Sequence, residues 1–384
     1  MTAHPLTIGL SVGTQPPLSR VRALTRMARL FRYDVAWVID HFLGFFPDSI
    51  WDKDFSWLAK PGHSPHEFYD YQVLLGYLAK RAGRVQLGVG VTEPVRRHPV
   101  LIAQSFMTLA HMTRRPPILG IGAGEAENTV PYGLDFSTPV SRLEEALQVV
   151  RLCFESDGPF DFEGRHFALR DAVLDLRPPP GRTPRIWIAA HQPRMLALTG
   201  RYGDGWYPTF PFTPAEYESS LGEIAAAATA AGRDAKAIVP AWQSLAVLAR
   251  TERAARKLLD HKGVRFSALL APAYAWEALG AEHPLGDGFR GLVDFIPQAY
   301  ERKELEAAIA AVPVDLLASA MLWGTPSAVL RNLHDYVDAG LRHLVLQPIS
   351  GLVSRHDALY SLRSAVSIQR KLRRRGPPKG TSTT

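Results

Sequence analysis

Acidic and imidazole side chains stand directly after several short apolar runs of this 384-residue chain. The run WVI is followed by Asp40 and His41, the run GVGV by Thr92 and Glu93, and the run GIGAG by Glu125. A carboxyl group and an imidazole that converge on one atom can act as the acid and the base of a proton transfer. These residue types therefore indicate an enzyme that moves protons.

A further apolar run, IWIAA, is followed by His191 and Gln192. Each of these residues alone has a structural explanation: Asp40 would serve as a helix cap, for example, and Glu93 as the partner of Arg96 or Arg97. Their recurrence at the ends of successive apolar runs favours a common site, because an acid and a base must meet at one reacting atom.

The stretch ILGIGAGEAEN raises a separate question, because Gly120, Gly122 and Gly124 occupy alternate positions. A dinucleotide-binding fingerprint requires G-x-G-x-x-G, and here the third glycine is replaced by Glu125, which would repel a pyrophosphate. Glycines within a barrel strand instead allow close approach of backbone or ligand. The pattern therefore favours a barrel strand with Glu125 at its carboxyl end.

Eight short apolar runs alternate with helical patterns, which is typical of parallel strands buried on both faces. Eight such units predict an α/β fold, a (β/α)₈ TIM barrel, whose chemistry lies at the carboxyl ends of the strands. The predicted strands are 6–12, 35–40, 85–91, 117–124, 185–190, 205–208, 241–249 and 343–349.

We expect a single barrel domain over residues 1–370, because no change of composition indicates a linker. Three long segments interrupt the pattern, and long loops in compact domains are often lids or binding loops. They are 42–66, 157–184, which contains a predicted hairpin in FDFEGRHFAL, and 262–323. Residues 371–384 are predicted to be a basic flexible tail.

The composition excludes several classes of protein. Cys153 is the only cysteine, so an internal disulfide framework and a CxxC metal site are both excluded. No signal peptide or stretch of roughly 18 apolar residues is evident, which predicts a cytoplasmic protein. The net charge of +7 and the basic tail allow at most peripheral contact with an anionic membrane. Aromatic residues do not interleave with the basic ones, which disfavours nucleic-acid binding.

The motifs WVIDHF, LGVGVTEPVRRHPVLIAQ, LGIGAGEAEN and IWIAAHQPRMLALTGRYGDGWYP together resemble the bacterial-luciferase-like superfamily along nearly the whole chain. Within it, DH together with GAGEAEN resembles the branch that uses the deazaflavin coenzyme F420 in preference to FMN. The segments PYG, AEHPLGDGF and DFIPQ resemble the mycobacterial phthiodiolone and phenolphthiodiolone dimycocerosate ketoreductases.

The resemblance implies that the coenzyme lies across the mouth of the barrel, with Asp40 and His41 beside its ring. It also implies a non-prolyl cis peptide near Gly90, within the run Val89-Gly90-Val91. Thr92 would face the coenzyme, Glu125 would stand near the reacting edge, and Asn128 would contact the ring or the ribityl chain.

The phosphate of the coenzyme is expected, on the same resemblance, at the turn that contains Ala190, His191 and Gln192. Helix N-termini bind phosphate through free N–H groups. Since Pro193 has no N–H, His191, Gln192 and Arg194 are expected to contribute more.

Two departures from relatives that oxidise a sugar phosphate indicate an apolar substrate. Phe45 stands where those relatives have tryptophan, and aromatic residues replace a phosphate-binding lysine after the sixth strand. We therefore predict an apolar ketone or alcohol pocket, although these side chains could equally plug the rim of the barrel. The predicted pocket residues are Phe45, Trp206, Phe210 and Phe212, with Tyr207 in the same aromatic stretch.

The resulting hypothesis is an F420-dependent oxidoreductase of the ketoreductase or alcohol dehydrogenase type, in which hydride moves between deazaflavin C5 and the substrate carbon. His41 would exchange the proton, Asp40 would orient His41, and Glu125 would act as a second acid or base. No metal is predicted, and relatives suggest a homodimer. The alternatives are an FMN-dependent monooxygenase of the same superfamily and a non-catalytic deazaflavin-binding protein.

Overall fold

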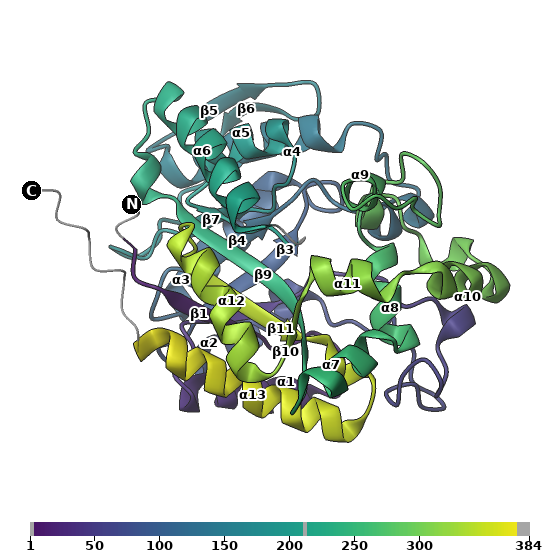
Figure 1. Cartoon of the computed structure of the whole chain (residues 1–384). Coiled ribbons are helices and arrows are strands. Elements are labelled where there is room, and N and C mark those ends of the chain that lie inside the picture. The colour runs from purple at the N-terminus through teal and green to yellow at the C-terminus, as the bar shows by residue number, and fades with distance from the viewer. Residues whose placement is uncertain (1–3, 210–212, 375–384) are drawn as a thin grey trace, which may run out of the picture.

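The central feature of the molecule is a closed ring of parallel strands (Figure 1). The structure is a computed structural model, and it describes residues 4–209 and 213–374. Within these residues, eight strands form the ring in the order β1-β2-β3-β4-β7-β8-β9-β11, and β11 pairs with β1 again. They are β1 (Thr7–Ser11), β2 (Val35–Val38), β3 (Gln86–Thr92), β4 (Ile118–Ile121), β7 (Arg185–Ile188), β8 (Gly205–Trp206), β9 (Val239–Leu248) and β11 (His343–Pro348).

The predicted (β/α)₈ barrel is thereby confirmed, and the dinucleotide-binding alternative is excluded. A further strand that the sequence did not reveal, β10 (Leu322–Gly324), pairs with the end of β9 through Leu322 and Ala246. It has three residues and lies at the end of the predicted 262–323 interruption. So short a strand shows no hydrophobic period, which explains why it was missed.

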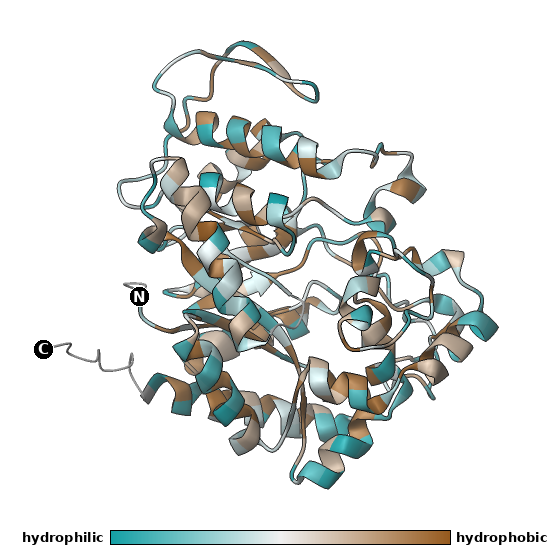
Figure 2. Cartoon of the chain, turned by 45° about the horizontal axis from the view of Figure 1, so that its top comes forward, coloured by the Kyte–Doolittle hydropathy of each residue, from teal (hydrophilic) through white to brown (hydrophobic). Residues whose placement is uncertain are grey.

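Helices cover the outside of the ring, and the strands between them are the more hydrophobic layer (Figure 2). Helix α1, for example, buries Val21, Thr25 and Ala28, which share one face at helical spacing. The helices are α1 (Leu18–Leu30), α2 (Tyr71–Ala82), α3 (Pro99–Met112), α4 (Pro139–Glu155), α5 (Pro193–Tyr202), α6 (Pro214–Ala230), α7 (Glu252–Leu259), α8 (Lys262–Leu269), α9 (Ala273–Glu277), α10 (Arg302–Ala311), α11 (Val314–Ala320), α12 (Pro326–Asp338) and α13 (Arg355–Arg374).

The interior of the barrel is packed with large rings. The Trp37 ring lies 5.3 Å from that of Trp187 and 4.6 Å from that of Tyr207. The indole N–H of Trp37 donates to Nε2 of His343 over 3.1 Å. A Cβ atom at Gly88 would lie 2.6 Å from the Trp37 ring, so glycine is needed there to admit the indole. The interior is thus a solid floor beneath the mouth of the barrel.

The glycines of β4 serve backbone packing. A Cβ atom at Gly120 would lie only 2.1 Å from the carbonyl oxygen of Val89 on the neighbouring strand, whereas one at Gly122 would make ordinary contacts at 3.4 Å or more. The close approach occurs where the register of β3 against β4 shifts between Val89 and Thr92. Gly120 therefore accommodates an irregular segment of β3 and does not cradle a phosphate.

The predicted hairpin within 157–184 is confirmed as the antiparallel pair β5 (Phe160–Glu163) and β6 (Ala168–Ala172). The other two interrupting segments pack on each other, in a second hydrophobic core apart from that of the barrel. Phe266 of α8 lies 5.7 Å from Phe46 and 5.6 Å from Phe55, measured between ring centroids. Segments more than 200 residues apart thus form one unit beside the barrel, which the sequence pattern did not reveal.

The boundary predicted for the basic tail is wrong by four residues. Helix α13 continues to Arg374, with Leu372 buried and Arg373 paired with Asp34 near the start of β2. Residues 375–384, the rest of the predicted tail, lie outside the described residues. No helix in the described part of the chain is long and apolar enough to cross a bilayer.

Candidate active site

The polar groups predicted from the strand ends meet at one edge of the barrel. His41 follows β2, Thr92 ends β3, and Glu125 follows β4, and these three strands are neighbours in the ring. Parallel strands bring their carboxyl ends to the same edge, so residues far apart in sequence become adjacent. The structure thus brings together Asp40, His41, Thr92 and Glu125.

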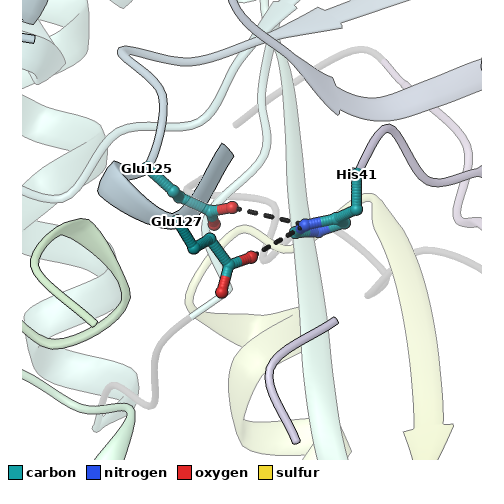
Figure 3. A group of neighbouring side chains, drawn as sticks. All are labelled: His41, Glu125 and Glu127. Atoms are coloured by element: carbon teal, nitrogen blue, oxygen red, sulfur yellow. Dashed lines mark hydrogen bonds and ion pairs between the residues drawn. The ribbon is translucent and has the colours of Figure 1, made fainter. Parts of the chain in front are cut away.

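The His41 ring is the centre of the site (Figure 3). Its Nδ1 atom lies 3.0 Å from Oε1 of Glu127, 2.9 Å from Nδ2 of Asn128 and 3.7 Å from Oε2 of Glu125. The side chain of His41 is only 8% exposed, that of Glu127 is fully buried, and that of Glu125 remains 26% exposed. Glu125 is therefore the carboxyl group of this cluster that solvent or a ligand can reach.

The Asn128 side chain is held in one orientation by the backbone of the β2 loop. Its Oδ1 atom accepts hydrogen bonds from the N–H groups of Phe42, over 2.7 Å, and Leu43, over 3.4 Å. Its Nδ2 group must then point to the cluster, where it lies 3.2 Å from both Glu125 Oε2 and Glu127 Oε1. The predicted coenzyme-binding residue Asn128 thus serves, in this structure, to organise the acid–base cluster.

Burial controls the charge state of the cluster. Desolvation raises the pKa of Glu127 to about 9 and that of Glu125 to about 7, from an ordinary value of 4.5. Desolvation also lowers the pKa of His41, although the nearby carboxylates oppose this shift. At neutral pH the cluster therefore contains a neutral imidazole, a protonated Glu127 and a Glu125 near its midpoint.

Asp40 has partners other than those we predicted. Its carboxylate accepts a hydrogen bond from the Thr92 hydroxyl over 2.6 Å and pairs with Arg96 at 2.9 Å and Arg97 at 3.2 Å. The ring of His41 bonds Glu127, Asn128 and the backbone of Leu43, whereas Asp40 acts on it through charge, so the expectation that Asp40 orients the imidazole is corrected. Asp40 instead neutralises the two arginines beneath the site.

The predicted pair between Glu93 and an arginine is confirmed. Glu93 is buried and bonds the Nε group and the backbone N–H of Arg96. The Arg96 guanidinium also lies over the ring of Phe42, 4.6 Å from its centroid. Arg96 therefore links the ends of β2 and β3, and Glu93 belongs to this support and not to the acid–base cluster.

Glu127 is the site residue that the sequence reasoning missed. It lies two residues after Glu125, in the 3-10 turn Ala126–Asn128. A strand would place positions 125 and 127 on one face, but this turn follows the strand and folds both carboxyl groups around Asn128. A second glutamate within the quoted motif GEAEN was the available signal.

The segment Val89-Gly90-Val91 has the backbone feature that the resemblance implied, since the Gly90–Val91 peptide bond is cis. Val89 is buried, whereas Gly90 and Val91 are partly exposed. A Cβ atom at Gly90 would lie 3.1 Å from the Tyr207 hydroxyl, so this bond lies above the aromatic floor of the barrel. Thr92 is buried and its hydroxyl is used by Asp40, so its side chain supports the site from below.

The predicted phosphate turn follows β7 and opens α5. Ala190 is buried and its carbonyl accepts the indole N–H of Trp206, while Gln192 and Arg194 are exposed. Nε2 of His191 lies 3.3 Å from the backbone N–H of Thr209. Arg194 is paired with Glu144 at 3.2 Å.

The predicted pocket aromatics are separated by the fold. Phe45 lies edge-on against His41, with ring centroids 4.8 Å apart. Trp206 is fully buried against Tyr217, and Tyr207 is fully buried in the barrel floor. Trp206 and Tyr207 therefore belong to the core and not to the rim or a pocket, whereas Phe45 stays beside the cluster. Phe210 and Phe212 lie outside the described residues.

The cluster also has the composition of a metal site. One ligand-type atom from each of His41, Glu125 and Glu127 lies within 4.8 Å of the other two. The Nδ2 group of Asn128, however, lies 2.9–3.2 Å from one such atom of each residue. Because an N–H donor occupies the position that a cation would take, this donor set favours hydrogen bonding over metal binding.

Comparisons with known proteins connect this geometry to a family. The family described as luciferase-like monooxygenase matches residues 2–343. Phthiodiolone/phenolphthiodiolone dimycocerosates ketoreductase from Mycobacterium tuberculosis is 37% identical over 334 residues, which cover 86% of this chain and 88% of the relative. The F420-dependent glucose-6-phosphate dehydrogenase of Amycolatopsis mediterranei is 27% identical over 318 residues, covering 81% of this chain and 83% of the relative.

Solved structures show the same fold. An F420-dependent secondary alcohol dehydrogenase in complex with an F420–acetone adduct has a TM-score of 0.69 and 20% identity, covering 91% of this chain and 97% of the other. The coenzyme F420-dependent tetrahydromethanopterin reductase of Methanopyrus kandleri has a TM-score of 0.70 and 19% identity, covering 94% and 97%.

Proposed function

Because the chain belongs to the luciferase-like monooxygenase family, we propose that it is an F420-dependent oxidoreductase that interconverts a ketone and an alcohol on an apolar substrate. The observation that carries the proposal is the cluster at the mouth of the barrel. There a buried neutral imidazole, bonded to Glu127 and Asn128, lies near a partly exposed carboxyl group, Glu125. Such an arrangement suits proton exchange at a carbonyl oxygen.

The residues around the cluster fit a flat, anionic coenzyme. The partly exposed backbone of Gly90 and Val91 would hold the ring system, while Gln192 and Arg194 at the start of α5 would hold the phosphate end. Deazaflavin supplies the hydride chemistry when it is bound. The protein's contribution is to position the substrate, exclude water and exchange a proton.

His41 and Glu125 have complementary parts in this proposal. A neutral imidazole presents an N–H group to a developing alkoxide without adding a buried charge. Glu125, whose pKa is raised to about 7 by burial, can hold or release a proton near neutral pH. Both groups work in either direction of the reaction.

An apolar substrate is supported by the surroundings of His41. Phe45 and Phe68 lie 4.8 and 5.6 Å from its ring, centroid to centroid. A pocket with such walls binds through the apolar area removed from water. The ketoreductase named among the relatives acts, by its name, on phthiodiolone and phenolphthiodiolone dimycocerosates, and an apolar ketone of that kind is our proposed substrate class.

The family description as a monooxygenase supports one rival, an FMN enzyme that consumes oxygen. Titration of the purified protein with oxidised F420 and with FMN, followed by fluorescence, separates the two. We expect F420 to bind and the reduced form to be reoxidised by apolar ketones, without oxygen uptake. FMN binding with oxygen uptake would contradict the proposal, and F420 binding without any substrate-dependent spectral change would indicate a coenzyme carrier.

The variant His41→Ala tests the assignment of the proton donor. We expect turnover to fall roughly 10²-fold or more, while coenzyme affinity stays close to that of the parent, because the imidazole is mostly buried among protein groups. The exposed histidine His63 is the control, since its side chain is 61% exposed and pairs with Glu67 at the surface. Equal turnover in His41→Ala and His63→Ala would remove His41 from the reaction.

A further inference from the structure

The arrangement of donors around Nδ1 of His41 determines which ring nitrogen carries the proton. Asn128 can only offer its N–H₂ group to this atom, because its Oδ1 is used by the N–H groups of Phe42 and Leu43. The 2.9 Å distance favours a bare nitrogen there, because a hydrogen on Nδ1 would point two N–H groups at each other. In the neutral ring the proton is therefore on Nε2.

The same geometry determines the state of Glu127. Its Oε1 atom lies 3.0 Å from a nitrogen that has no hydrogen, so an ionised carboxylate would place two acceptors against each other. A protonated carboxyl group removes this conflict, because its O–H can share the single lone pair of Nδ1 with the Asn128 N–H group. The other oxygen, Oε2, is buried and has no hydrogen-bond partner in the described structure, which would leave an ionised group poorly stabilised.

We infer that Glu127 is a proton-storing positioning residue that, together with Asn128, keeps His41 in its Nε2-protonated form and supplies the proton that the ring passes on. The inference rests on the proposed function for its chemical step. The step is a transfer through the ring: the Glu127 O–H bond breaks as Nδ1–H forms, and Nε2–H breaks as the alcohol O–H forms.

The electron and proton balance follows from the proposed reduction. Reduced deazaflavin, when bound, would supply the hydride that the carbonyl carbon gains, while the carbonyl oxygen takes the Nε2 proton of His41 and Glu127 is left as a carboxylate. The ring then returns a proton to Glu127 from water once the product has left. A neutral imidazole can give up a proton at Nε2 without becoming an anion only if it gains one at Nδ1, which is why the buried carboxyl group matters.

The charged groups that act on Glu127 come from neighbouring elements. Arg96, after β3, favours the ionised form through its positive charge, and Asn128 favours it through its hydrogen bond, but burial dominates. Glu125, on the same turn, lies across Asn128 from it.

A second buried histidine, His343, provides an internal reference for the NMR experiment, because its neutral ring is protonated on the other nitrogen. His343 lies in the barrel floor, where its Nε2 accepts the indole N–H of Trp37 over 3.1 Å and its Nδ1 lies 2.8 Å from the Thr7 hydroxyl. Since an indole N–H is only a donor, the proton of neutral His343 is on Nδ1. The two histidines are therefore expected to show opposite tautomers.

Nitrogen NMR of histidine-labelled protein tests the tautomer without coenzyme or substrate. We expect an Nε2–H signal for His41 and an Nδ1–H signal for His343 at pH 7, with His41 assigned by its loss in His41→Ala. Asn128→Asp replaces the donor by an acceptor of the same shape and should convert His41 to the Nδ1–H or doubly protonated form, with His343 unchanged as proof of an intact barrel. Nδ1–H at His41 in the parent would overturn the inference.

Two measurements on Glu127→Gln test the stored proton. The infrared difference between parent and variant at pH 7 should show the carbonyl band of a protonated carboxyl group, and a carboxylate band there would overturn the inference. Turnover should fall roughly 10²-fold with coenzyme affinity retained, because the glutamine amide still donates to Nδ1 but cannot release a proton. The surface variant Glu67→Gln is the control, and parent-like turnover in Glu127→Gln would also overturn the inference.

These experiments distinguish a failure of this inference from a failure of the proposed function. If deazaflavin or ketones prove to be the wrong ligands, the NMR and infrared results still decide whether Glu127 stores a proton beside His41. If they fail while F420-dependent turnover is present, the proposed function stands and the relay is wrong.

Discussion

At the scale of single residues, the proposed chemistry depends on three side chains held by one amide. Asn128 satisfies two backbone N–H groups with its oxygen and faces His41, Glu125 and Glu127 with its nitrogen. A buried amide that contacts this many groups fixes their relative positions, and the low dielectric around it keeps His41 and Glu127 neutral. Proton exchange then depends on burial as much as on residue type.

The pH dependence of stability reports the buried proton of Glu127. Its folded pKa of about 9 exceeds the ordinary value of 4.5, so the stabilisation is complete below pH 4.5 and is lost as the pH rises towards 9. Glu127→Gln should remove this loss, so at pH 7 its free energy of unfolding should exceed that of the parent by about 3 kcal/mol. Denaturant unfolding between pH 4 and pH 9 measures the difference.

The control for that experiment is Glu67→Gln, whose parent side chain is exposed. Its stability should follow the parent at every pH. A Glu127→Gln curve parallel to that of the parent would mean that Glu127 is ionised in the folded protein.

The close approach of β3 to β4 leads to a second prediction at the residue scale, which concerns the stability of glycine variants. Gly120→Ala places a methyl group against the Val89 carbonyl and should destabilise the protein by about 2–3 kcal/mol. Gly122→Ala adds the same group where contacts are ordinary and should change stability by less than about 1 kcal/mol. Similar losses in thermal unfolding for both variants would contradict the account of β4.

At the scale of elements, the proposed function assigns acid–base groups to strand ends and coenzyme-binding groups to the start of a helix. The irregular end of β3 and the first turn of α5 lie at the mouth of the barrel, and both present partly exposed backbone or side chains. Helix α5 begins with Pro193, which offers no N–H, so side chains must supply part of the attraction for an anion.

Two arginines of α5 offer a matched test of whether the start of this helix binds the coenzyme. Arg194, in the first turn, and Arg201, in the last, both pair with Glu144. We expect Arg194→Gln to weaken F420 binding about fivefold, which is a loss of roughly 1 kcal/mol of binding free energy. This difference between parent and variant should become smaller as the salt concentration rises. Arg201→Gln should leave the affinity unchanged. Equal effects in fluorescence titrations would show that only the net charge of the helix matters.

At the scale of the whole molecule, the barrel is accompanied by a second core built from two distant segments. This core joins the loop after β2, which begins next to His41, to the helices α8–α11 (Figure 1). Folding of the insertion is thus coupled to the position of the loop that carries Phe45, which is among the residues packed on this core.

Phe266 tests the coupling, because it is fully buried and contacts rings of both segments. Phe266→Ala should cost about 3–5 kcal/mol of stability and should increase proteolytic cleavage within residues 42–66. Leu279→Ala, at a position 47% exposed, should do neither. Destabilisation of Phe266→Ala without added cleavage in 42–66 would show that the two segments are held independently.

The sequence by itself determined the order of the strands and the residues at their ends. Apolar runs and helical periods are local properties, so they predicted the barrel and placed Asp40, His41 and Glu125 at one edge. The position of the cis peptide, in contrast, came from family resemblance. Local pattern was also sufficient to predict the hairpin and the pair between Glu93 and an arginine.

The tertiary structure alone decided which of these groups touch. Nδ1 of His41 contacts Glu127 and Asn128, whereas Asp40 pairs with arginines. Trp206 is buried in the core, and the segments that contain Phe46 and Phe266 pack against each other. Such pairings depend on distances between residues far apart along the chain and on side-chain orientation after a turn. Burial, which sets the proton positions, likewise exists only once the chain has folded.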